Sequence, residues 1–137
     1  MESNKRITII VADDDDDDRE LLQSLFNERE EFELIGCFES GIEVIKEIMI
    51  NKTIPDVLVI DMYMPMLNGS EIIKRIEESE IAPDMMKFIF STTINTTEQN
   101  KYHKNDSVKF LKKPSTLAEI NGLPDVILKT MHHSAKV

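Results

Sequence analysis

Short apolar runs alternate along the chain with longer stretches in which apolar residues recur every three or four positions. The runs are nearly continuous in apolar residues, which is typical of strands buried on both faces of a sheet. We predict five strands, at residues 7–12, 33–38, 56–61, 87–90 and 108–112. The stretches between them are long enough for crossover helices, so the order of elements indicates an α/β domain with a parallel sheet.

The amphipathic stretches predict five helices. They cover residues 18–27, a segment opening at Ser40 and Gly41, residues 70–78, residues 97–104, and a last helix capped by Ser115 or Thr116. The first helix should present Leu21, Leu22, Leu25 and Phe26 as its apolar stripe. Gly122 and Pro124 predict a kink or break in the last helix.

Length and charge narrow the possible functions. A chain of 137 residues fits one domain with a real core, and no linker or second module is visible, so we expect residues 1–137 to form one domain without an output domain. The net charge of -10 repels nucleic acid. No apolar stretch resembles a signal peptide or a membrane span, so we expect a cytoplasmic protein without a membrane partner.

Polar residues follow the predicted strands where parallel sheets collect their ligands, at the carboxyl ends. Asp13 and Asp14 follow the first strand, Asp61 ends the third, Ser91 and Thr92 follow the fourth, and Lys113 follows the fifth. Three converging carboxylates would repel one another unless a cation joined them, and their hard oxygen atoms suit Mg²⁺. A lysine and a hydroxyl beside that ion could hold the oxygens of a phosphoryl group.

These residues fall in motifs that, in their order and spacing, identify a family. The motifs are the acidic pair, Asp61-Met62-Tyr63-Met64-Pro65 followed by Gly69, the hydroxyl after the fourth strand, and Phe110-Leu111-Lys112-Lys113-Pro114. The chain resembles the receiver domains of two-component response regulators, and in size the single-domain chemotaxis type. The resemblance implies a doubly wound, flavodoxin-like fold with helices on both faces and strand order 2-1-3-4-5.

The resemblance also implies roles for individual residues. Asp61 would accept the phosphoryl group from a sensor histidine kinase or a histidine phosphotransfer protein. Asp14, Asp61 and the Tyr63 backbone carbonyl would bind Mg²⁺ or Mn²⁺, with Asp13 acting directly or through water. Lys113 would pair with the phosphoryl oxygens. The resulting signal would pass to a downstream protein by contact, with at most slow self-dephosphorylation.

The switch hydroxyl has two candidates. Either Ser91 or Thr92 can occupy the family's position, and Ser91 is preferred because it directly follows the apolar run. Phe110 matches the aromatic residue that moves inward in the family, where tyrosine is common. Tyr63, two residues past Asp61, should overhang the site and affect the access of water.

The remaining aspartates, residues 15–18, are interpreted as a cap and a favourable charge for the first helix. A calcium loop is excluded because Asp18 and Ser24 occupy the positions of its glycine and glutamate. Two other functions compete with the switch. Asp13 and Asp15 loosely fit a haloacid dehalogenase-type phosphatase, although the chain is short and Asp17 replaces an expected threonine or valine. A receiver-like adaptor without phosphoryl chemistry is disfavoured by the intact acids and Lys113.

Overall fold

The computed structural model describes residues 5–92, 96–101 and 105–135. Its strands form one parallel sheet in the order β2-β1-β3-β4-β5, which confirms the predicted topology. The strands are β1 (Ile7–Ala12), β2 (Phe32–Phe38), β3 (Val57–Asp61), β4 (Met86–Ser91) and β5 (Val108–Lys112).

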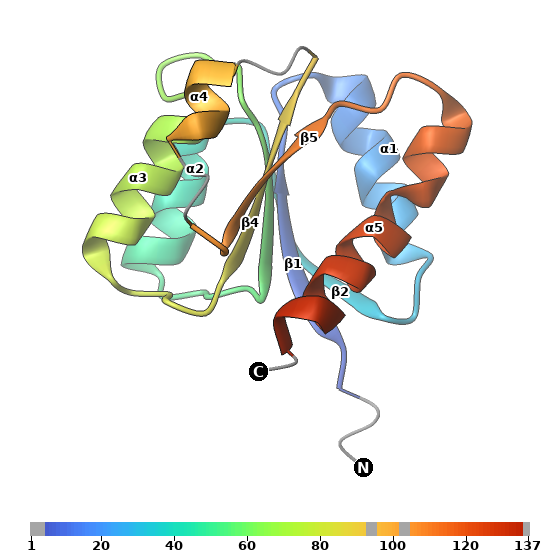
Figure 1. Cartoon of the computed structure of the whole chain (residues 1–137), viewed down its shortest axis with the longest axis horizontal. Helices are drawn as coiled ribbons and strands as arrows, with labels where there is room; N and C mark the ends of the chain where they lie inside the picture. Colours follow the sequence, from blue (N-terminus) through green and yellow to red (C-terminus); the bar gives the residue numbers. More distant parts are fainter. Residues whose placement is uncertain (1–4, 93–95, 102–104, 136–137) are drawn as a thin grey trace.

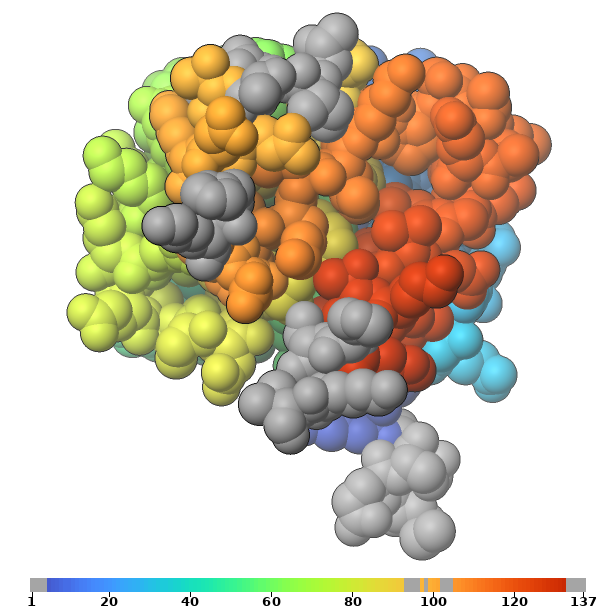
Figure 2. Space-filling view, viewed as in Figure 1, coloured from blue at the N-terminus to red at the C-terminus, as the bar shows by residue number. Residues whose placement is uncertain are grey.

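Helices cover both faces of the sheet. They are α1 (Asp16–Asn27), α2 (Gly41–Ile45) continued by the π-helical turn η2 (Lys46–Ile50), α3 (Gly69–Ser79), α4 (Thr96–Asn100) and α5 (Leu117–Ala135). Helices α1 and α5 lie on one face, and α2, α3 and α4 lie on the other (Figure 1). In the space-filling view, α5 occupies the right of the visible surface and α3 and α4 occupy the left (Figure 2).

The strands divide the core into two layers because successive side chains point to opposite faces. In β3, Val57 and Val59 pack with the buried residues of α1 and α5, whereas Leu58 and Ile60 pack with those of α2 and α3. All four are fully buried. The next position in this alternation, Asp61, lies on the α1 and α5 side where β3 ends. The rigid sheet therefore fixes where the Asp61 side chain is presented.

The first helix begins earlier than predicted. It starts at Asp16 because Asp15 caps it: the Asp15 carboxylate accepts a hydrogen bond of 3.0 Å from the Asp18 backbone N–H. Its apolar stripe is narrower than expected, since Leu22 and Phe26 are buried but Leu21 is 42% exposed. The prediction that an aspartate of the acidic run caps this helix is confirmed.

The last helix was predicted to kink or break, and the structure shows no break. Helix α5 runs without interruption through Gly122 and Pro124. A proline inside a helix costs about 3 kcal/mol. Leu123 and Ile127 are buried against the sheet, and each contributes about 1.5–3 kcal/mol through that burial, which offsets the proline. The cap at the start is confirmed, because Thr116 Oγ1 accepts a hydrogen bond from the Glu119 backbone N–H.

The helix predicted at residues 97–104 is described as α4 only up to Asn100, and residues 102–104 lie outside the described residues. In the described parts of the chain, no helix is both long enough and apolar enough to cross a bilayer.

Candidate functional site

The carboxyl ends of β1, β3 and β5 meet at one end of the sheet, at the top of Figure 1. Backbone hydrogen bonds extend the strand pairing into the functional positions. The Asp13 N–H donates to the Phe38 carbonyl at 3.1 Å, and the Lys113 N–H donates to the Ser91 carbonyl at 2.7 Å. These hydrogen bonds hold the backbone of Asp13 and of Lys113 in place, although both residues lie just past the ends of their strands.

Asp13, Asp14 and Asp61 meet as the sequence predicts. One carboxylate oxygen from each lies within 4.8 Å of the others. Asp13 and Asp61 are only 1% and 7% exposed, whereas Asp14 is exposed. The cluster is thus a half-enclosed cup of oxygen atoms with one side open to solvent.

Lys113 reaches into this cup from the end of β5. Its Nζ lies 2.9 Å from Asp13 Oδ2, 2.9 Å from Asp18 Oδ2 and 3.4 Å from Asp61 Oδ2. The Lys113 side chain is 15% exposed. Lys112, the other lysine of the motif, is exposed. Of these two lysines, only Lys113, which the sequence placed at the end of the fifth strand, therefore reaches the acidic cluster.

Burial and neighbouring charges shift the pKa values of both Asp61 and Lys113. Burial, reinforced by the neighbouring Asp13, raises the pKa of Asp61 from 3.8 to about 6, although Lys113 and the Tyr63 backbone N–H oppose the rise. Burial alone would lower the pKa of Lys113, but Asp13, Asp18 and Asp61 together raise it well above its usual value. At neutral pH the site thus contains a charged lysine and a carboxylate that is costly to ionise.

The negative charge of the site is only partly balanced by Lys113, and a bound cation would balance it further. Asp13 Oδ2 is buried and, among the described residues, accepts no directed hydrogen bond; its close contact with Lys113 is an ion pair. Three carboxylates face one ammonium group here, while Asp14 completes the oxygen cluster from the solvent side. Hard oxygen donors with an open side suit Mg²⁺ or Mn²⁺.

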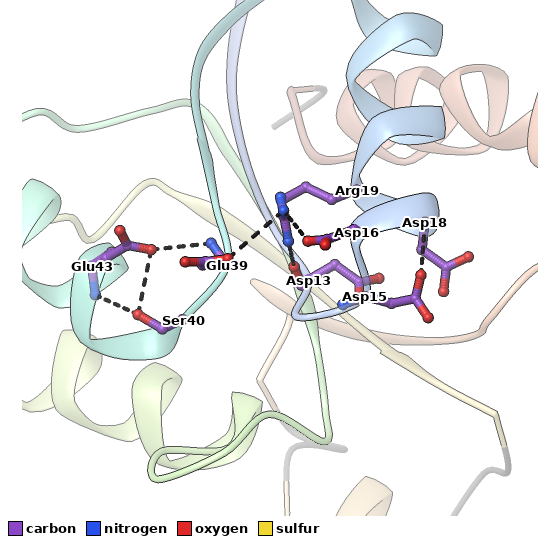
Figure 3. Close-up of polar contacts among 8 residues, drawn as sticks. All are labelled: Asp13, Asp15, Asp16, Asp18, Arg19, Glu39, Ser40 and Glu43. Carbon is purple, nitrogen blue, oxygen red and sulfur yellow. Dashed lines mark hydrogen bonds and ion pairs between the residues drawn. The ribbon is translucent and has the colours of Figure 1, made fainter.

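Arg19 braces the acidic loop from inside α1. Its guanidinium donates to the Asp13 backbone carbonyl at 2.8 Å and also to the Asp16 carboxylate, and it lies 3.8 Å from Glu39. Figure 3 shows Arg19 between the acidic loop and the loop that follows β2. Asp13 Oδ1 in turn accepts from the Asp15 backbone N–H at 3.0 Å. These bonds fix both the peptide and the side chain of Asp13.

The two candidate switch hydroxyls differ in environment. Ser91 is the last residue of β4 and is 2% exposed, whereas Thr92 is exposed. Ser91 follows Ile89 by two positions, so both point to the face where Phe110 is partly buried against the core. Ile89 is also the strand partner of Phe110. The structure therefore places Ser91, and not Thr92, on the same face as Phe110.

The loop after β3 is held close to Asp61. The Gly69 backbone N–H donates to the Met62 carbonyl at 2.9 Å, and a Cβ on Gly69 would come within 2.9 Å of the Asp61 carbonyl oxygen. Glycine is thus required for this close approach. The Tyr63 backbone N–H lies 3.4 Å from Asp61 Oδ1, and its side chain is 55% exposed.

Two residues that contact the site were not predicted from the sequence. Asp18 was assigned only to the helix terminus, yet its carboxylate pairs with Lys113. Arg19 was given no role, yet it holds the Asp13 carbonyl. Their position in the sequence could have indicated these roles. When a helix directly follows a strand that ends at a site, the first turn of that helix lies beside the site.

The comparisons with known proteins agree with this architecture. The family model described as "response regulator receiver domain" matches residues 9–123. The chain therefore belongs to the response regulator receiver domain family.

Individual relatives show how far the likeness extends. The protein-glutamate methylesterase/protein-glutamine glutaminase of Pyrococcus abyssi is 31% identical over 138 residues, which cover 98% of this chain and 36% of the relative. The protein of the same name from Geobacillus kaustophilus is 32% identical over 134 residues, covering 95% and 37%. The chain thus spans about a third of the length of these relatives.

Solved structures give the same picture. The response regulator domain of Thermotoga maritima CheB is 26% identical, with a TM-score of 0.71 over 93% of this chain and 96% of that one. The chemotaxis response regulator CheY4 of Vibrio cholerae has a TM-score of 0.74 over 92% and 99%, at 15% identity, which supports the fold alone.

Proposed function

We propose that the chain is a phosphorylation-dependent signalling switch, in which Asp61 accepts a phosphoryl group from a sensor histidine kinase or a histidine phosphotransfer protein. The observation that carries this proposal is the convergence of Lys113 Nζ on Asp61 and Asp13 inside a receiver fold. A largely enclosed ammonium group beside a buried carboxylate can stabilise the negative charge that a phosphoryl group brings to that carboxylate.

In the proposed transfer, a carboxylate oxygen of Asp61 attacks the phosphorus atom of a phosphohistidine. A phosphorus–oxygen bond forms, the phosphorus–nitrogen bond breaks, and its electron pair returns to the imidazole nitrogen. The product is an acyl phosphate on Asp61. Lys113 pairs with a phosphoryl oxygen and so offsets the negative charge that the transfer brings into the cup. Later attack by water on phosphorus would release phosphate and restore the carboxylate.

The oxygen cluster supports a role for a divalent cation in the same step. Asp13, Asp14 and Asp61, together with the Tyr63 backbone carbonyl, would hold Mg²⁺ or Mn²⁺. When bound, the ion would neutralise negative charge on the carboxylates and on the phosphoryl oxygens. Arg19 would support this metal site indirectly, because its hydrogen bond to the Asp13 carbonyl keeps the Asp13 backbone in place.

We further propose Ser91 as the hydroxyl that senses the phosphoryl group. Its burial at the end of β4 and its shared face with Phe110 support this choice over the exposed Thr92. Phe110 lines an open hollow of about 430 Å³ beside Gln99 and Asn100. A shift of Phe110 in response to Ser91 would change that surface, through packing alone because phenylalanine has no phenol oxygen.

Output in this proposal takes place by contact with a downstream protein, with residues 1–137 acting as one receiver unit. The methylesterase relatives match the chain over about a third of their length, and within that length the match covers nearly all of this chain. The function proposed here is therefore that of the receiver portion, with no more than slow self-dephosphorylation.

Intact-mass analysis tests the proposal. After incubation with acetyl phosphate and Mg²⁺, the wild type should gain the mass of one phosphoryl group, and Asp61→Asn should gain none. A wild type that gains no phosphoryl group from acetyl phosphate or from a histidine kinase would contradict the proposal. Ser91→Ala and Thr92→Ala form a matched pair for the switch: both should be phosphorylated, but only Ser91→Ala should lose the accompanying change in Phe110, followed by NMR.

A further inference from the structure

Asp18 brings a further carboxylate to Lys113. It belongs to the first turn of α1, and its Oδ2 lies 2.9 Å from Lys113 Nζ, the same distance as the buried Asp13 and closer than Asp61 at 3.4 Å. Its backbone N–H donates to the capping residue Asp15, which fixes the position of Asp18 on the helix. The cap is made by Asp15, so the Asp18 carboxylate is left to contact Lys113.

Carboxylates surround the ammonium group of Lys113. It carries three N–H donors, and it faces three carboxylates at 2.9, 2.9 and 3.4 Å. A phosphoryl oxygen arriving on Asp61 needs one of these donors. The phosphoryl group therefore competes with these carboxylates for the ammonium group when Asp61 is phosphorylated.

Exposure decides which contact is released. The Asp13 side chain is 1% exposed and would lose its partner inside the protein. The Asp18 side chain is 40% exposed, so its carboxylate can turn into water at little cost. The Asp61 carboxylate itself becomes part of the acyl phosphate. Asp18 is thus the contact that breaks most easily.

We propose that Asp18 is a positioning residue that holds Lys113 in the unphosphorylated protein and exchanges with the phosphoryl group for the same ammonium donor. This inference rests on the proposed function of Asp61 and adds a competitor to it. The competition sets how strongly Lys113 favours the phosphorylated state. Removing the Asp18 charge should therefore strengthen the binding of a phosphoryl group, not weaken it.

The test compares Asp18→Asn with Asp17→Asn, using beryllofluoride as a phosphoryl mimic with saturating Mg²⁺. Both changes remove one negative charge from the same acidic run, but Asp17 is exposed and has no ion pair within the described residues. The half-saturating concentration of beryllofluoride should fall about twofold to fivefold further in Asp18→Asn than in Asp17→Asn, the size expected for a half-exposed ion pair. The affinity for Mg²⁺ alone should be the same in both variants.

The outcomes separate the exchange from the function on which it rests. If the wild type binds beryllofluoride but the two variants bind it equally, the exchange is overturned and the proposed function stands. If Asp18→Asn also differs from Asp17→Asn in its affinity for Mg²⁺ alone, Asp18 acts on the metal site and the exchange is again overturned. If the wild type binds no beryllofluoride and gains no phosphoryl group, both fail together.

Discussion

At the scale of single residues, Asp61 combines deep burial with a charge that the protein only partly compensates. Burial and Asp13 raise its pKa to about 6, and Lys113 limits the rise. Because the raised pKa belongs to an acid, the folded protein binds the Asp61 proton more tightly than the unfolded chain does. The contribution of Asp61 to stability therefore falls as the pH rises from about 4 to about 6, and stays low above that range.

The Asp61→Asn variant should make this cost visible. Without divalent metal, it should be more stable than the wild type at pH 7.5 by on the order of 3 kcal/mol, since the pKa of Asp61 is raised from 3.8 to about 6 and each pKa unit corresponds to about 1.4 kcal/mol. The difference should shrink towards pH 4, where Asp61 is protonated in the wild type as well. Urea unfolding in EDTA across this pH range measures it. A difference that is independent of pH would contradict this account.

Tyr63 tests how the loop after β3 controls water. Its side chain is 55% exposed beside the site, and its backbone N–H faces Asp61. We expect Tyr63→Ala to speed hydrolysis of the acyl phosphate several-fold, because a shield over the phosphorus atom is removed. Met66→Ala is the control, since Met66 lies in the same loop and is 83% exposed. Equal decay rates in Tyr63→Ala and the wild type would remove this role.

At the scale of elements, two glycines have opposite effects on their helices. Gly122 lies inside α5, and a Cβ built there has no atom within 4 Å. Gly122→Ala should therefore stabilise the protein by about 0.5–1 kcal/mol, the helix preference of alanine over glycine. Gly69→Ala should destabilise it, because its Cβ would meet the Asp61 carbonyl oxygen at 2.9 Å. Thermal unfolding of both variants measures these effects. A shift of the unfolding temperature in the same direction in both variants would contradict this prediction.

The elements also show how far sequence can predict structure. The strands were predictable because buried strands are nearly continuous in apolar residues, and their ends located Asp13, Asp61 and Lys113. Two features depended on tertiary packing instead. Burial of Leu123 and Ile127 kept α5 intact through Pro124, and β2 carries an extra residue at Ile35, where its pairing with β1 shifts register.

Side-chain pairing within the site was the least predictable part. Asp18 and Lys113 are far apart in the sequence, and nothing in the acidic run distinguishes Asp18 from Asp17. The choice is made by geometry, because the first turn of α1 points one of these carboxylates at the end of β5. For the hydroxyl after β4, the sequence already favoured Ser91 over Thr92, and the structure adds that Ser91 is buried whereas Thr92 is exposed.

At the scale of the whole molecule, six of the 26 acidic residues follow β1 as consecutive aspartates at the carboxyl end of the sheet. The start of β1 and the end of α5 lie at the opposite end (Figure 1). A cation bound in the acidic cup would relieve the repulsion among its carboxylates. The stability of the entire domain should therefore depend on divalent metal.

Mg²⁺ should raise the unfolding temperature of the wild type, with a gain of about 1.4 kcal/mol at ten times the dissociation constant. Asp14→Ala should lose most of this gain, whereas Asp17→Ala, which removes the same charge outside the cup, should keep it. The gain should also fall below pH 6, because the ligands must be deprotonated. Thermal scans with and without Mg²⁺ measure all three effects, and equal gains in the two variants would contradict the assignment of the cup.

The central claim, that Asp61 is the phosphoryl acceptor, is tested most directly by locating the phosphoryl group. Borohydride reduces an acyl phosphate to an alcohol, so trapping the phosphorylated protein should convert residue 61 to homoserine. Peptide mass spectrometry would then find homoserine at position 61 and unmodified aspartate at positions 13 and 14. Homoserine at another acid, or phosphorylated protein with residue 61 unchanged, would contradict the account.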